Sequence, residues 1–117
     1  MVLTTWSKDK VKELLLDWLE TDFTKFAIGT DSTVEDSFDT ALGNEVFRDD
    51  VDEVNTTSNS ILFRCYVGKT EVNGNALSEV GLFDSSDNML LRKVYGTINK
   101  TQDMDIWFEI EVVISVS

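Results

Sequence analysis

Carboxylates are the most abundant side chains in this sequence that could take part in chemistry. The close pairs are Asp49 with Asp50, Asp52 with Glu53, Asp84 with Asp87, and Asp103 with Asp105. Two neighbouring carboxylates can act as general acid and general base if an apolar pocket raises the pKa of one of them. With 22 acidic residues in the chain, however, close pairs arise by chance, and nothing marks one pair as buried. We interpret each pair as solvated and predict no catalytic residue.

The chain has no histidine and a single cysteine, Cys65. Histidine is the commonest general base, and a cysteine nucleophile usually needs such a base beside it. Cys65 alternates instead with Ile61, Phe63 and Val67, which predicts a small hydrophobic side chain on a buried strand face. A zinc motif and an internal disulfide cannot be formed from one cysteine, and no glycine-rich phosphate-binding motif is present. We therefore predict that the protein is not an enzyme and needs no cofactor.

Two features could still bind a ligand. The loop from Asp84 to Asn88 offers oxygen atoms to a hard cation such as calcium, but it lacks the EF-hand pattern, so we predict no metal site. Trp107 lies on the more polar face of the last predicted strand and could stack on a sugar. Val113 shares that face, which favours the inner layer of a second sheet or a contact with another subunit.

An amphipathic helix is expected over residues 5–20, with Thr5 or Ser7 as its N-cap. Its apolar stripe has spacings of three and four residues and consists of Val11, Leu14, Leu15, Trp18 and Leu19. Leu16 lies off this stripe and could touch a neighbouring subunit. We expect the stripe to pack on the protein's own sheet, and a subunit contact is the alternative.

The remainder, about residues 23–116, predicts five or six strands. Less regular strands are expected at residues 23–28 and at residues 45–52, the second with a bulge at Val46 and Phe47. Clear alternation of apolar and polar side chains marks residues 61–67, 76–83, 89–95 and 104–114. These patterns predict one domain over residues 1–117, which is mainly β: an antiparallel β-sandwich or curled sheet with one N-terminal amphipathic helix. Proline is absent, so edge strands must be protected by charge, by bulges or by pairing with another chain.

The formal net charge of −12 argues against nucleic acid and anionic membranes as partners. No stretch is long and apolar enough to insert into a membrane, and the first 20 residues lack the apolar core of a signal peptide. We therefore expect the protein to be made and folded in a cytoplasm.

Several short motifs follow one another along the predicted strands. They are residues 26–30, 40–48, 77–84, 88–93 and 98–100, within a stretch from about Phe26 to Val116. In this order they resemble the tail-fibre, tail-collar and minor tail proteins of tailed bacteriophages. Within them, Gly81 permits a close approach, and Glu79 can pair with Arg92 across two strands; alternatively, these charges face a neighbouring subunit.

The resemblance implies a structural protein of the virion tail that acts by self-assembly, as a collar, baseplate or fibre-attachment module. The implied partners are copies of itself, in a trimer or ring, and other tail proteins. Because the sequence stops directly after the last strand, at Ser117, we expect an adaptor rather than a receptor-binding tip. The alternatives are a tail-fibre module that binds glycans of the host surface, and a head decoration or connector protein.

Overall fold

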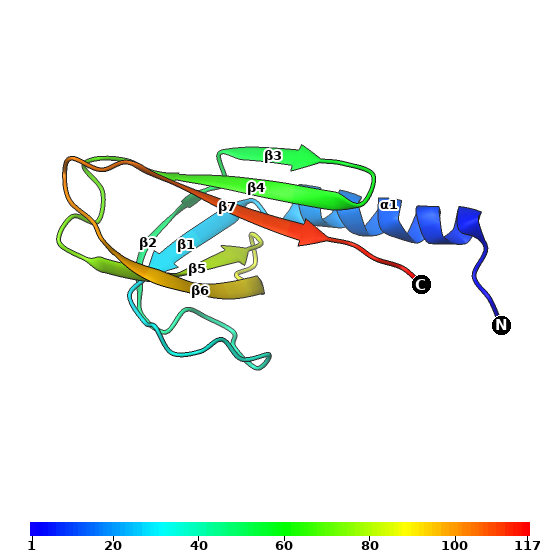
Figure 1. Ribbon diagram of the computed structural model, residues 1–117, viewed down its shortest axis with the longest axis horizontal. Coiled ribbons are helices and arrows are strands. Elements are labelled where there is room, and N and C mark those ends of the chain that lie inside the picture. The colour runs from blue at the N-terminus through cyan, green and yellow to red at the C-terminus, as the bar shows by residue number, and fades with distance from the viewer.

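The computed structural model describes all residues from 1 to 117 and contains one helix and two sheets (Figure 1). The helix is α1 (Thr5–Asp22). The strand order of the first sheet is β2 (Glu45–Asp50), β1 (Lys25–Gly29), β5 (Ala76–Phe83) and β6 (Met89–Asn99). That of the second sheet is β3 (Glu53–Thr56), β4 (Ser60–Val67) and β7 (Ile106–Val113). All neighbouring strands are antiparallel, which confirms the predicted mainly β fold with one N-terminal helix.

The main core lies between the two sheets. The second sheet contributes to this core mainly through β4, in which every second side chain is fully buried: Ile61, Phe63, Cys65 and Val67. On β7 the buried residues are Phe108 and Ile110, as the alternation predicts. The first sheet adds Phe26, Ile28, Val80 and Leu82 to the same cluster.

The central strand β5 departs from the predicted alternation of buried and exposed residues. Every residue from Leu77 to Phe83 is buried. One face of β5 points into the main core, and the residues 31–44, which we call the 31–44 loop, cover the other. There Leu42 packs on Ala27 and Phe83 in a second small cluster. A strand covered on both sides needs no polar face, so alternation fails at this position.

The structure has seven strands, whereas the sequence predicts five or six. The predicted strand over residues 45–52 ends at Asp50, and β3 begins at Glu53 in the other sheet. Val54 of β3 pairs with Phe63 of β4. The predicted bulge is confirmed at Val46, where the register between β1 and β2 shifts by one residue.

The helix differs from the prediction in which face it buries. Leu16 and Leu19 are its buried residues, at 5% and 3% exposure, so the expectation that Leu16 faces outward is wrong. These two residues and Phe23 share one side of α1, and that side packs on the second sheet at β3 and β4. The N-cap is Thr4, whose Oγ1 accepts a hydrogen bond from the Ser7 amide at 3.2 Å. Figure 1 shows the first turns of α1 extending beyond the β3–β4 hairpin along the longest dimension of the molecule, which measures 54 Å.

Candidate interaction surfaces

The first candidate surface is the apolar stripe of α1, formed by Val11, Leu14, Leu15 and Trp18. Leu14 is 58% exposed and Trp18 46%, and the other two are exposed by more than a third. Leu19, the fifth residue of the predicted stripe, is buried together with Leu16, so the helix does pack on the protein's own sheet as predicted, but these four residues do not lie on the packed side. Trp18 is held from one side by an edge-on contact with Phe23, with ring centroids 5.1 Å apart. Of the predicted stripe, only Leu19 lies on the packed side of the helix, and the other four residues leave an exposed apolar surface.

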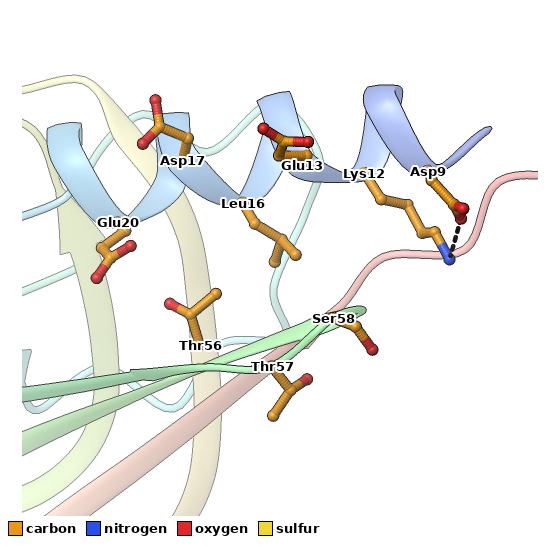
Figure 2. Close-up of a pocket in the computed structure, with 9 residues that line it drawn as sticks. All are labelled: Asp9, Lys12, Glu13, Leu16, Asp17, Glu20, Thr56, Thr57 and Ser58. Atoms are coloured by element: carbon orange, nitrogen blue, oxygen red, sulfur yellow. Dashed lines mark ion pairs between the residues drawn. The ribbon is translucent and has the colours of Figure 1, made fainter. Parts of the chain in front are cut away.

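A groove of about 540 Å³ separates α1 from the β3–β4 turn (Figure 2). The helix contributes four carboxylates to its lining, from Asp9, Glu13, Asp17 and Glu20. Lys12 is the single basic residue there, and its Nζ lies 3.7 Å from the Asp9 carboxylate. The end of β3 and the turn that follows it form the other wall, with Thr56, Thr57 and Ser58. The groove is acidic and open, so it suits a basic side chain of a partner better than an apolar one.

A buried ion pair joins β5 to β6. Glu79 is fully buried, and its Oε1 accepts a hydrogen bond from Arg92 Nε at 2.8 Å. The Arg92 side chain is 4% exposed, so both charges belong to the interior of this chain. The predicted cross-strand pair is thereby confirmed, and the alternative that Glu79 faces a neighbouring subunit is wrong.

Three backbone amides complete the surroundings of the Glu79 carboxylate. Oε1 also accepts from the Gly43 amide at 2.8 Å. Oε2 accepts from the amides of Asp31 at 3.0 Å and Asn44 at 2.9 Å. Burial acts to raise the pKa of Glu79, but the hydrogen bonds from Arg92 and these amides outweigh it, so the pKa lies below its ordinary value. The carboxylate is therefore charged and fully engaged, as in a structural anchor.

This anchor fixes both ends of the 31–44 loop. Arg92 adds two contacts at 3.3 Å, from Nη1 to Asp39 Oδ2 and from Nη2 to the Asp31 carbonyl oxygen. Gly43 is required by the close approach, because a Cβ there would lie 1.7 Å from Asp31 Oδ2. The tip of the loop exposes two apolar side chains, Phe38 at 90% and Val34 at 80%. A fixed loop with apolar residues at its tip is a second candidate surface.

The third candidate surface lies between the free edges of β6 and β7. A groove of about 240 Å³ separates the two sheets there, and seven of its nine lining residues are hydrophobic. Tyr95 of β6 reaches across it to Phe108 of β7, with ring centroids 5.1 Å apart. Both strands are last in their sheets, so each leaves one row of backbone groups without a strand partner.

Trp107 lies on the outer face of the second sheet. The prediction that its face forms the inner layer of a second sheet is wrong, because Phe108 and Ile110 form the inner face. The indole is 43% exposed, and the Arg64 guanidinium lies over its ring, 4.4 Å from the centroid. Tyr66 lies beside it at 4.9 Å. One ring face is therefore already occupied by a cation–π contact.

The two acidic residues of the loop from Asp84 to Asn88 bind other groups of the same chain. Asp84 Oδ1 accepts from the amides of Ser86 at 3.0 Å and Asn88 at 2.8 Å, so this carboxylate closes its own hairpin loop. The Asn88 side chain also donates to Asp84 Oδ2 at 3.0 Å, and this hydrogen bond, followed by the two from the backbone amides, lowers the pKa of Asp84. Asp87 forms an ion pair with Arg48 at 2.7 Å.

Cys65 is fully buried, and burial raises the pKa of its thiol to about 12. The thiol is thus protonated at neutral pH and out of reach of solvent. This agrees with the prediction of a small hydrophobic side chain.

A comparison with models of known families gives no match, and neither does a comparison with curated proteins. The resemblance to tail proteins therefore stays a prediction from the motifs. The structure contains no helix that is both long enough and apolar enough to cross a membrane.

Proposed function

We propose that this protein is a structural subunit of a viral tail, used as a collar, baseplate or fibre-attachment module, and that it acts by contacts with copies of itself and with other tail proteins. The observation that carries the proposal is the apolar stripe of α1, whose four side chains are between 37% and 58% exposed. Large apolar side chains gathered on one exposed face are typical of interaction sites. Covering the exposed parts of Leu14 and Trp18 would stabilise an assembly by about 2 kcal/mol each.

The buried ion pair supports a role in assembly. It holds the 31–44 loop in one position, so that little conformational freedom is lost when Phe38 and Val34 contact a partner. A subunit that must fit the same neighbours many times benefits from such preorganised surfaces.

The motifs that resemble tail proteins converge in space on this ion pair. Residues 77–84 contribute Glu79, and residues 88–93 contribute Arg92. Residues 40–48 contribute the amides of Gly43 and Asn44, and residues 26–30 contribute Gly29, whose absent Cβ leaves room for Glu79. The motifs thus describe a structural unit, which is what a fold signature of a family of structural proteins would encode. This supports the tail assignment.

Immunogold labelling of virus particles with an antibody against this protein tests the proposal. We expect label at the tail in several copies. Label confined to the head would favour a decoration or connector protein instead, and particles without label would refute a virion role.

Glycan binding is the second candidate function, and the half-exposed indole of Trp107 is the observation that favours it. A glycan array with the wild type and with Trp107→Ala separates the two functions. Binding that is lost in the variant would support a glycan site, whereas no binding by the wild type would leave assembly as the function.

A further inference from the structure

The charges of α1 are divided between its two halves. Residues 5–12 carry three lysines and one aspartate, and residues 13–22 carry four carboxylates and no basic residue. The first turn has no acidic residue and the last turn no basic one. This order opposes the helix dipole, which favours acidic side chains at the N-terminus and basic ones at the C-terminus by about 0.3–1 kcal/mol each. The arrangement therefore does not serve the isolated helix.

A pair of opposite charges flanks the apolar stripe. At 100° per residue, Lys10 and Asp17 fall on the same flank, whereas Lys8 falls on the other flank and Asp22 falls in line with the stripe, between Val11 and Leu15. Within the chain, Lys10 has only an exposed contact with Glu13 at 3.6 Å. The flanking charges are thus accessible to a partner that covers the stripe.

We propose that the stripe of α1 binds α1 of a second copy of this chain, in antiparallel orientation about a two-fold axis. An antiparallel pair places the basic half of each helix on the acidic half of the other and also aligns the two helix dipoles favourably. When Val11 packs on Leu14 of the second copy, Lys10 lies opposite Asp17 of that copy, and the two-fold axis repeats this pair. This inference rests on the proposed role in assembly and names the partner for one of its surfaces.

A parallel bundle of helices fits the charges less well. In the heptad arrangement of parallel helices, Asp17 of one copy lies beside Asp22 of the next, and like charges there oppose association. A trimer or ring therefore has to use other surfaces, such as the free edges of β6 and β7. A helix of 18 residues is about 27 Å long, so the pair is a small interface and we expect a dissociation constant on the order of micromolar.

Sedimentation equilibrium of the full chain over a concentration series tests the proposal. The wild type should dimerise, and Leu14→Glu should weaken the dimer at least 100-fold while the circular dichroism spectrum stays that of a folded protein, because Leu14 is 58% exposed. The matched control is Val113→Glu, at a position outside α1 that is similarly exposed, at 61%, and this variant should leave dimerisation unchanged. A dimer that survives Leu14→Glu would place the contact elsewhere and overturn the inference.

Charge reversal tests the orientation. Lys10→Asp and Asp17→Lys should each weaken the dimer about tenfold, and the double variant or an equimolar mixture of the two single variants should restore it. An Asp17→Lys variant that dimerises more tightly than the wild type would indicate parallel helices and overturn the antiparallel model. A monomeric wild type found in labelled tails would refute this inference alone, whereas a monomer absent from particles would refute the proposed function as well.

Discussion

Replacing Glu79 by glutamine should destabilise the fold strongly, although the two side chains have the same shape. Each Glu79 oxygen accepts two hydrogen bonds: Oε1 from Arg92 and Gly43, and Oε2 from Asp31 and Asn44. Whichever oxygen becomes an NH₂ group, two donors lose their acceptor, and the guanidinium of Arg92 keeps only Asp39 as an anionic partner. Breaking a buried pair from one side costs about 3–5 kcal/mol. For a chain of this size that is a fall in Tm of about 12–20 °C.

Urea denaturation at pH 7 and thermal unfolding followed by circular dichroism measure this loss. Glu109→Gln is the matched control, because it removes the same charge from an exposed pair with Arg64 at 3.1 Å. That exposed pair should contribute less than about 1 kcal/mol. If Glu79→Gln costs no more than Glu109→Gln, the buried ion pair is not the anchor of the fold.

Three further predictions concern the same framework. The folded-state pKa of Glu79 is depressed, so its contribution to stability should be complete above the ordinary value of 4.5 and should be lost as the pH falls below it; Glu79→Gln should flatten this part of a stability–pH profile. Gly43→Ala should push Asp31 aside and speed hydrogen exchange in the 31–44 loop, with a smaller effect in the two sheets. Lys100 is 2% exposed and donates to three oxygens, from the Lys69 and Thr101 carbonyls and the Asn73 side chain, so Lys100→Met should cost about 1–3 kcal/mol in urea denaturation.

The sequence predicts best those elements whose burial depends on one neighbour only. The strands β4 and β7 each have one face in the core and one outside, so alternation locates them closely. The sequence of β5 does not reveal that both faces of this strand are buried, because the 31–44 loop that covers the second face comes from a distant part of the chain. The short strand β3 has four residues, too few for a period of two to be distinguished from a loop.

The helix has apolar residues on two sides, and the sequence cannot decide which of them meets the sheet. Leu16 and Leu19 lie on the side that faces the β3–β4 hairpin, and only the position of that hairpin makes this side the buried one. The buried ion pair was partly predictable. Glu79 and Arg92 lie on adjacent strands, but the amides that bind Glu79 belong to a loop whose path the strand pattern does not specify.

Cross-linking mass spectrometry of purified virus particles is the most direct test of a tail subunit that assembles through α1. With a zero-length carbodiimide reagent, Lys10 should be linked to Asp17, which lies about 10 Å away along the same helix and is therefore reached only in a second copy, or to a carboxylate of another tail protein. Particles that lack the protein, or cross-links from Lys10 confined to its own chain, would contradict the account.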